Sequence, residues 1–267
     1  FLSGRVELKG GGDATAAARA VLQSGETDYA WNLQIEKTIA EQMAASATTG
    51  VLIATTGNSV EQLLINFADP NTEVDGARSE PSTQHPIFKD KRVRDAIRIS
   101  SDRETIATQL YGEAGTASPN TLVAPSSFKS PNTSMEYDLT KAAALLDEAG
   151  WTKDGTVRKK DGKDLALSYM TTVNPVRQKT QEILKQSWQE LGIAVELRAI
   201  DAGVFFSSDA GNPDTISHFY ADIGMFTNGP TSTYPLDYMS GFKSTDPATD
   251  LAQKSNQWSG GNYNRWV

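Results

Sequence analysis

Hydrophobic positions along the chain follow two spacings, one typical of strands and one typical of helices. The pattern is clearest between Leu165 and Ala199, where two short apolar runs enclose a long amphipathic stretch. Apolar positions in that stretch recur every three or four residues, as on one helix face, at Val176, Thr180, Ile183, Leu184, Trp188 and Leu191. Asn174-Pro175 supplies a cap and a first-turn proline, and Gly192 ends the helix. A strand, a helix of this length and a second strand predict a right-handed crossover between parallel strands.

The same two spacings predict further elements before this unit. Val6-Glu7-Leu8 alternates as a strand does, and Gly10-Gly11-Gly12-Asp13 is interpreted as a turn into a helix. The stretch from Asp69 to Pro86 is rich in proline, serine, threonine and charge, which favours an exposed loop. We expect strands at 6–8, 27–31, 51–54 and 62–67, and helices at 14–23 and about 34–45.

Helices with clear start signals follow the loop. Ser101 with Glu104 has the pattern of a capping box inside the helical stretch 90–112. Asp138 is placed to cap a later helix with one apolar stripe.

A last strand is expected at about 217–225, and it completes the predicted set of elements. Strands that alternate with helices predict an α/β fold with a mixed, largely parallel sheet flanked by helices. We expect residues 1–267 to form a single lobe of this kind.

Composition and charge exclude several classes of protein. The chain has 267 residues, of which 38% are hydrophobic and 22% charged, as in soluble globular domains. A formal net charge of −8 is opposite to that of a nucleic-acid-binding surface, so no nucleic-acid partner is expected. The basic cluster Arg158-Lys159-Lys160 lies in a Gly/Asp-rich hairpin and is interpreted as a solvated turn. No apolar run reaches about 18 residues, and Phe1-Leu2-Ser3-Gly4-Arg5 lacks a signal-peptide pattern, as expected of a mature or truncated chain.

Residue types needed for catalysis or metal binding are scarce. The chain has no cysteine and two histidines, His85 and His218, which are too few for a His-based metal site. It has no Gly-x-Ser-x-Gly nucleophile motif, and Gly10-Gly11-Gly12 lacks the Gly-Lys-Ser/Thr of a phosphate loop. Carboxylates are numerous, and only their separation in space decides whether two form a catalytic pair. We expect no cofactor, no metal and no enzyme activity.

Aromatic and polar residues follow several predicted strands, at the positions where open α/β sheets bind ligands. They are Trp31 and Asn32 after the second strand, Asn174 and Arg177 after the first strand of the crossover, and Phe226, Thr227 and Asn228 at the last strand. Aromatic rings with amides and one arginine suit a polar organic solute. Structural roles are the alternatives: Trp31 and Phe226 as core, Asn174 as a helix cap, and Arg177 as a surface charge.

One stretch of sequence carries a more specific pattern. It contains Val93-Arg94-Asp95-Ala96-Ile97, Ser101-Asp102-Arg103-Glu104-Thr105-Ile106 and Tyr111-Gly112-Glu113-Ala114, and ends in Tyr137-Asp138-Leu139 through Glu148-Ala149-Gly150-Trp151. In order, spacing and identity it resembles the extracytoplasmic solute-binding proteins of the peptide, opine and nickel class, bacterial solute-binding protein family 5. The family resemblance implies a protein of two lobes that close on a ligand. Since that family is longer, we expect this chain to begin and end inside the protein and to lack the other lobe.

The resemblance also implies a function. It implies the substrate-binding component of an ABC-type importer, which captures an oligopeptide or peptide-like polar solute and delivers it to permease subunits in the membrane. The protein would be periplasmic or extracytoplasmic, and we expect a monomer. By resemblance Asn58 lies near the hinge-side strand and contacts ligand, with a role in a turn as the alternative. A hydrolase acting on a similar solute, and a solute sensor or peptide chaperone on the same fold, are the competing functions.

One departure from the family pattern bears on the ligand. Peptide-binding members of the family carry a Trp on the last strand and an Asp three residues later, which pairs with the peptide amino terminus. Here Phe226 and Gly229 stand at the positions that resemble these two. Either Asp237 or a residue of the other lobe replaces the carboxylate, or the solute is not a simple peptide. We expect weak discrimination in favour of free amino termini.

Overall fold

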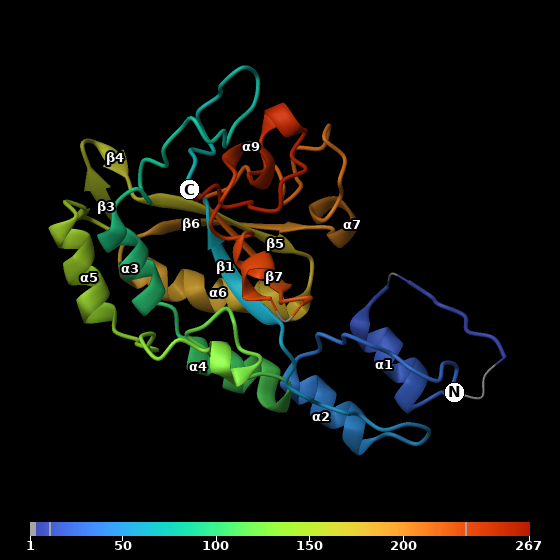
Figure 1. Ribbon diagram of the computed structural model, residues 1–267. Coiled ribbons are helices and arrows are strands. Elements are labelled where there is room, and N and C mark those ends of the chain that lie inside the picture. The colour runs from blue at the N-terminus through green and yellow to red at the C-terminus, as the bar shows by residue number, and fades with distance from the viewer. Residues whose placement is uncertain (1–3, 11, 233) are drawn as a thin grey trace.

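Four strands form the sheet at the centre of the structure. The computed structural model describes residues 4–10, 12–232 and 234–267 (Figure 1). The strand order is β1-β7-β5-β6, with β1 at Val60–Ile65, β5 at Ala166–Thr172, β6 at Ala194–Ile200 and β7 at Ile223–Asn228. β5 pairs in parallel with β6 and β7, whereas β1 pairs antiparallel with β7. The predicted α/β fold with a mixed, largely parallel sheet is therefore confirmed.

The crossover predicted between two parallel strands is also present. The helix between β5 and β6 is α6, Pro175–Glu190, and the Asn174 side chain accepts a hydrogen bond from the Arg177 backbone N–H at its start. After the helix, Gly192 has a φ of +82°, a left-handed conformation that glycine adopts without strain. Local start and stop signals and the apolar spacing agree here, which is why sequence alone located the unit.

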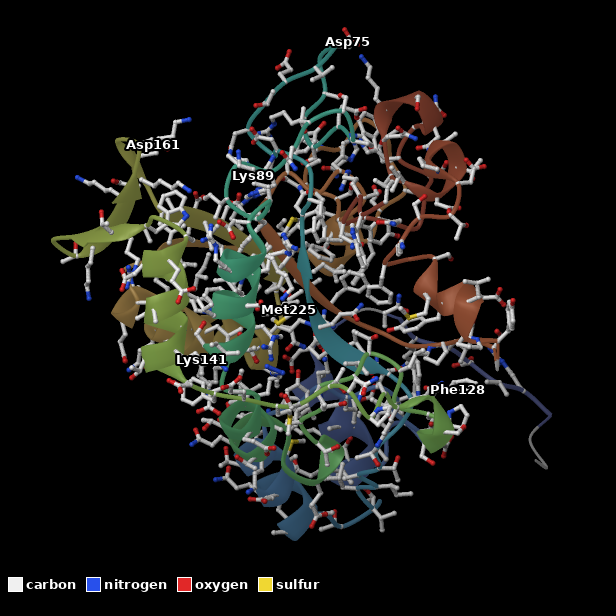
Figure 2. The ribbon with its side chains drawn as sticks, turned by 60° about the vertical axis from the view of Figure 1, so that its left-hand side comes forward. Asp75, Lys89, Phe128, Lys141, Asp161 and Met225 are labelled. Carbon is white, nitrogen blue, oxygen red and sulfur yellow. The ribbon has the colours of Figure 1, made fainter. Side chains whose placement is uncertain are left out.

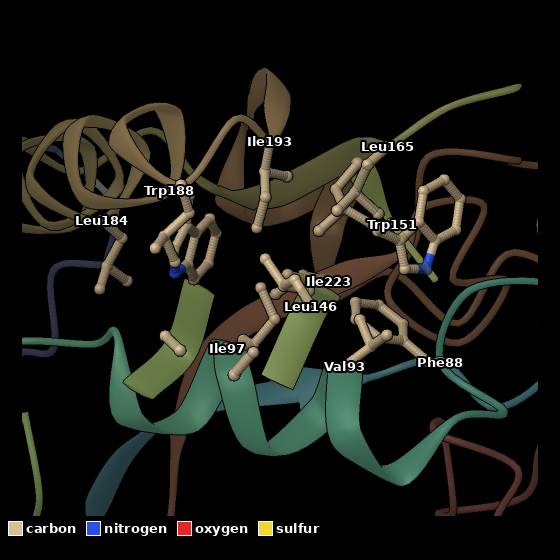
Figure 3. Close-up of a cluster of buried hydrophobic side chains, with 14 of the residues drawn as sticks. Phe88, Val93, Ile97, Leu146, Trp151, Leu165, Leu184, Trp188, Ile193 and Ile223 are labelled. Atoms are coloured by element: carbon tan, nitrogen blue, oxygen red, sulfur yellow. The ribbon is translucent and has the colours of Figure 1, made fainter. Parts of the chain in front are cut away.

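One face of the sheet packs against helices. α3, Lys91–Ile99, and α5, Leu139–Glu148, lie side by side, and each begins at an aspartate cap, Asp90 and Asp138. Figure 3 shows the core between these helices, α6 and the sheet. Its fully buried members include Phe88, Val93, Leu146, Leu165, Trp188, Ile193 and Ile223. Burial of these side chains is the main stabilising contribution to this half of the structure.

The carboxy-terminal part of the chain covers the opposite face (Figure 1). A second cluster of buried side chains lies there, formed by Leu64, Met170, Phe205, Ile216, Phe219, Ala221 and Phe226. The short helices in this region are α7 at Ala202–Phe205, α8 at Pro235–Met239, α9 at Pro247–Asp250 and the 3₁₀ turn η4 at Lys254–Asn256. The sheet is thus enclosed by two different kinds of cover, regular helices on one side and irregular chain on the other.

The last predicted strand begins later than expected. Of the range 217–225, only the final three residues belong to β7. Phe219 has a φ of +50°, and the Asn66 side-chain amide donates to the carbonyl oxygens of Phe219 and Ala221, at 2.9 and 3.1 Å. The residues of this range that precede β7 are mostly buried because the chain turns beneath the sheet there. They do not pair with a neighbouring strand.

The three strands predicted in the amino-terminal portion are absent. Residues 6–8, 27–31 and 51–54 belong to no strand in the part of the chain described. Their large side chains are mostly exposed, by 75–93% at Val6, Leu8, Tyr29, Trp31, Val51 and Ile53. The prediction of strands was wrong because alternation fixes which side chains share a face, whereas a strand also requires a neighbouring strand for its hydrogen bonds.

Two helices and a small cluster do form in this portion. They are α1, Ala14–Leu22, and α2, Lys37–Ala45, which meet at buried Ala18, Leu22 and Met43. In Figure 1 both helices lie below the sheet, and α2 lies between α4 and α1. Gly11, in the middle of the predicted turn before α1, and Phe1 to Ser3 lie outside the described residues.

The helical stretch after α3 differs from its predicted start. It comprises α4 at Arg103–Ile106, a π-helical turn η1 at Ala107–Tyr111 and a 3₁₀ turn η2 at Gly112–Ala114. The cap is Asp102, which accepts from the Thr105 backbone N–H, so the predicted Ser101–Glu104 capping box is wrong. Ser101 instead donates its hydroxyl to the Ile97 carbonyl at 2.7 Å, back into the preceding helix. A further 3₁₀ turn, η3 at Ser126–Phe128, interrupts the connection to α5 (Figure 2).

A small three-stranded sheet projects beside α5. It contains β2 at Thr152–Asp154, β3 at Val157–Lys160 and β4 at Lys163–Asp164, and Figure 2 labels Asp161 near its tip. Arg158 is 4% exposed, and its guanidinium donates to the carbonyl oxygens of Leu191 and Trp151, each at 2.6 Å, and to Asp147. The interpretation of Arg158-Lys159-Lys160 as a solvated turn was therefore wrong for Arg158. That arginine attaches the small sheet to the lobe.

None of the helices in the described residues is long and apolar enough to cross a membrane.

Candidate functional site at the carboxyl edge of the sheet

The carboxyl ends of β5 and β7 lie at the same edge of the sheet as the start of β1. The antiparallel register pairs Val60 with Asn228, Glu61 with Thr227 and Gln62 with Phe226. The first turn of α6 begins at this edge as well, directly after β5. Residues from three separate parts of the chain therefore meet where open α/β sheets bind ligands.

Four polar side chains meet beside the start of α6, and we call Glu61, Thr172, Arg177 and Thr227 the edge cluster. Arg177 Nε lies 3.1 Å from Glu61 Oε1, Nη1 donates to Thr172 Oγ1 at 2.6 Å, and Nη2 donates to Thr227 Oγ1 at 3.2 Å. Thr227 in turn donates to the Glu61 carboxylate. Arg177 is 7% exposed, so the alternative interpretation as a surface charge is excluded. A nearly buried ion pair is stable only when further hydrogen bonds satisfy both partners, and the two threonines provide them.

Two other parts of the chain contact the edge cluster. Gln34, just before α2, donates its amide to Glu61 Oε2 at 2.9 Å, and Lys179 on α6 forms an ion pair with Glu36. Tyr111, at the end of η1, has a buried hydroxyl without a hydrogen-bond partner among the described residues. Burial, and then the nearby Glu61 carboxylate, raise the pKa of Tyr111 well above the usual value for a phenol. The amino-terminal portion is thus attached to β1 and α6 at the candidate site.

A small hollow lies on the other face of the same edge. Alternate residues of a strand point to opposite faces, so Gln62 and Phe226 turn away from the edge cluster. The hollow, which we call the aromatic notch, has a volume of about 20 Å³ and is lined by Gln62, Leu64, Phe226, Asn228, Gly241, Phe242, Gly261 and Tyr263. Phe226 and Tyr263 lie 6.1 Å apart between ring centroids. A hollow of this size accepts one small group, about as large as a water molecule.

Gln62 leaves an unsatisfied acceptor at the notch. Its side-chain Oε1 is buried and has no partner among the described residues. Asn228, by contrast, accepts from the Gly229 backbone N–H through its own side chain at 2.8 Å, and its carbonyl accepts from Tyr238 at 3.5 Å. Burial raises the pKa of Tyr238 to about 12 and also raises the pKa of Tyr263, so both phenols are neutral.

The structure distributes the predicted ligand-binding residues over several positions. Asn58 donates its amide to the Pro230 carbonyl at 3.0 Å and so reaches the turn after β7. Asn174 caps α6, which is the structural role that the sequence offered as the alternative to ligand binding. Trp31 and Asn32 lie between α1 and α2, with the Trp31 side chain 76% exposed and Asn32 at a φ of +57°.

Sequence reasoning missed Gln34, Glu61, Gln62, Tyr111 and Tyr263 at this edge. It predicted a strand at 62–67, which includes Gln62 but begins one residue after Glu61, and had no evidence for the direction of that strand. The antiparallel direction of β1 brings its first residues, and not its last, to the carboxyl edge of β7.

The two histidines lie elsewhere and have partners. His85 Nε2 lies 2.8 Å from Asp222 Oδ1, and its Nδ1 accepts from the Ile87 and Phe88 backbone N–H groups. The His218 ring stacks on Trp258 at 4.0 Å between centroids. Within the described ranges, no three His, Cys, Asp or Glu side chains are grouped so that they could hold a metal ion.

Relatives of this chain are found by sequence. The Oligopeptide-binding protein AppA of Bacillus subtilis is 32% identical over 126 residues, which cover 44% of this chain and 23% of the relative. A putative ABC transporter peptide-binding protein of Brucella ovis is 25% identical over 216 residues, covering 80% of this chain and 36% of the relative. The chain therefore spans about a quarter to a third of the length of these curated relatives.

Solved structures have the same fold. An oligopeptide-binding protein from Thermus thermophilus, complexed with a pentapeptide, has a TM-score of 0.60 at 23% identity and covers 79% of this chain and 34% of its own. NikZ from Campylobacter jejuni, in complex with Ni(L-His), also has a TM-score of 0.60, at 22% identity, and covers 80% of this chain and 37% of its own. The family described as bacterial extracellular solute-binding proteins, family 5 middle, matches residues 3–250. The chain belongs to this family of extracellular solute-binding proteins.

Proposed function

We propose that this protein is the substrate-binding component of an ABC-type importer. It captures an oligopeptide or peptide-like polar solute outside the cytoplasm and delivers it to permease subunits in the membrane. The observation that carries the proposal is the aromatic notch at the carboxyl edge of a sheet, in a chain of the solute-binding family. Relatives and solved structures of this fold include oligopeptide-binding proteins, which supports a solute of this class.

Within the proposal, the predicted residues have two different roles. Phe226 and Asn228 line the notch and contact the solute, together with Gln62. Arg177 and Thr227 are positioning residues, because the donors of Arg177 are directed at Glu61 and the two threonines. Asn174 supports them by fixing the start of α6.

Capture further depends on a second lobe. We propose that residues 1–267 contribute one lobe, and that Trp31, Asn32 and Asn58 lie where the chain faces the other. The relatives are about three to four times as long as the matched segments, which leaves enough chain for such a lobe. Closure of two lobes on a solute buries it from water and creates the surface that a permease recognises.

Binding and turnover distinguish this function from that of a hydrolase. The protein, expressed from its complete natural reading frame, is incubated with a pool of tri- to pentapeptides, and bound and free peptides are identified by mass spectrometry. We expect a subset of peptides to be retained unchanged and to raise the melting temperature, because a ligand that binds only the folded state stabilises it. Cleaved products, or no retained peptide and no thermal shift, would contradict the proposal.

A further inference from the structure

Gln62 differs from the other polar side chains near the candidate site. It lies on β1 opposite Phe226, it is 9% exposed, and its Oε1 has no partner among the described residues. Buried side-chain oxygens normally accept a hydrogen bond, since a buried acceptor without a donor is costly. The unsatisfied oxygen belongs to a residue that lines the aromatic notch, and no donor among the described residues reaches it.

The residues around this oxygen provide no negative charge. None of the side chains that line the notch is ionised at neutral pH. Glu61, the next residue along β1, turns its carboxylate to the opposite face, where Arg177, Thr227 and Gln34 donate to it. Two positions remain to be considered as sources of a carboxylate in the notch. They are Gly229, where peptide-binding members of the family carry an Asp, and Asp237.

Neither position places a carboxylate in the notch. A Cβ atom at Gly229 would lie 2.8 Å from the Asn58 carbonyl oxygen and 2.9 Å from Ser59 Cα, so the backbone there has no room for a side chain. Asp237 is exposed on α8, and its carboxylate accepts from Ser232 Oγ at 3.1 Å. Within residues 1–267, a ligand ammonium in the notch would therefore lose its hydration without gaining an opposite charge, and only an acidic residue of the other lobe could supply one.

We infer that the notch binds an uncharged hydrogen-bond donor of the solute, such as an internal or blocked peptide N–H, and that Gln62 is the residue that selects it. This inference rests on the proposed function, because it assumes that a peptide-like solute reaches this edge. One uncharged N–H group fits the notch volume of about 20 Å³, satisfies Gln62 Oε1 and packs against the rings of Phe226 and Tyr263. Aromatic rings also attract cations, so a preference for ammonium groups is the competing outcome.

The test uses two matched pools of randomised tetrapeptides, one with free amino termini and one N-acetylated. Both are mixed in equal amounts with the protein expressed from its complete reading frame, and the retained fraction is quantified by mass spectrometry. We expect the wild type to enrich acetylated peptides by roughly 10-fold, about the effect of leaving a buried polar group unpaired. Gln62→Glu places a carboxylate at the same position and should reverse the preference.

Control variants separate the role of Gln62 from general effects of charge and folding. Gln186→Glu makes the same change at an exposed position on α6 and should leave the ratio of acetylated to free peptides unchanged. Gln62→Met removes the acceptor without adding charge; if Gln62→Glu does not fold, this variant should still bring the ratio close to one.

The outcomes distinguish this inference from the proposed function. A wild type that retains free-amine peptides preferentially, or a ratio that changes with neither Gln62 variant, overturns the inference alone. If Asp237→Asn removes a preference for free amines, Asp237 is the partner of the amine and the inference is wrong. Retention of neither pool by the wild type overturns the proposed function, and the inference with it.

Discussion

Arg177 and Glu61 form the ion pair of the edge cluster. The pair is largely buried, with side-chain exposures of 9% and 16%, and both partners have further hydrogen bonds. Such a pair contributes little net stability compared with apolar residues, but the loss of one partner leaves a buried charge uncompensated. The pair therefore determines the position of Thr227 and the start of β1.

We expect Arg177→Met to lower the free energy of unfolding by about 3 kcal/mol, because Glu61 would stay buried without its cation. The double variant with Glu61→Met should lose less than the single variant. Denaturation in urea measures both. Lys91→Met is the control, since Lys91 is 74% exposed beside Asp95, and it should change stability by less than about 1 kcal/mol. Equal losses for Arg177→Met and Lys91→Met would contradict the role of the pair.

The opposite effect on the free energy of unfolding is expected when Tyr111 is replaced. Its hydroxyl is buried without a hydrogen-bond partner among the described residues, so Tyr111→Phe should be neutral or stabilise the protein by about 1 kcal/mol at pH 7. Because burial and Glu61 raise the pKa of Tyr111, the folded state holds the phenol proton more tightly than the unfolded state does. The contribution of Tyr111 is thus present below pH about 10 and is lost as the pH rises above that value.

The free energy of unfolding of Tyr111→Phe should accordingly fall less steeply than that of the wild type above pH about 10. Urea denaturation at several pH values tests this, with Tyr29→Phe as an exposed control. A loss of more than about 1 kcal/mol at pH 7 would instead mean that the hydroxyl donates to Glu61.

Elements were predictable from sequence where local signals and tertiary surroundings agreed. Asn174, Pro175 and Gly192 mark the ends of α6, and the flanking strands β5 and β6 pair with each other in the sheet. The residues 6–8 have an equally regular alternation, but no strand pairs with them. Alternation is a property of one segment, whereas pairing depends on a second segment, and a single sequence contains no record of which two segments meet.

The same limit explains which residues at the candidate site could be located from the sequence and which could not. Phe226, Thr227 and Asn228 were predictable because they follow from the position of a strand end. Gln62 and Glu61 were not, because their place at the edge depends on the antiparallel pairing of β1 with β7.

Arg158 makes several of the contacts that attach the small sheet to the rest of the structure. We expect Arg158→Met to lower the free energy of unfolding by about 2 kcal/mol, because two buried carbonyls lose their donor. Hydrogen exchange should accelerate in β2 and β3 more than in α6. Lys163→Met on β4, where the side chain is exposed, is the matched control and should leave both measurements unchanged. Unaltered exchange in Arg158→Met would mean that the small sheet is held by other contacts.

In the whole molecule, stability is distributed unevenly. Two large clusters enclose the central sheet, whereas the amino-terminal portion is held by a cluster of three buried side chains, with Gln34 and Glu36 as attachments at the edge. Segments with few buried apolar contacts open at a lower free energy than the core.

Hydrogen exchange should therefore divide the molecule in two. We expect backbone amides in α1 and α2 to exchange at least about 100-fold faster than those in α6, because their local opening exposes little apolar surface. Mass spectrometry of exchanged peptides measures this directly. Equal protection in the two regions would show that the amino-terminal portion unfolds only with the lobe.

The exposed apolar segments at 6–8, 27–31 and 51–54 have a consequence for handling the protein. Their backbone groups lack strand partners, so each segment is a template on which another chain can add a strand. In a protein that consists of residues 1–267 alone, aggregation should begin from these segments and depend steeply on concentration. Lysines at Val51 and Ile53, which are both 77% exposed, should raise the concentration at which light scattering first detects particles, without changing the cooperative unfolding of the lobe. The limit to solubility is then set by the portion of the chain that contributes least to stability.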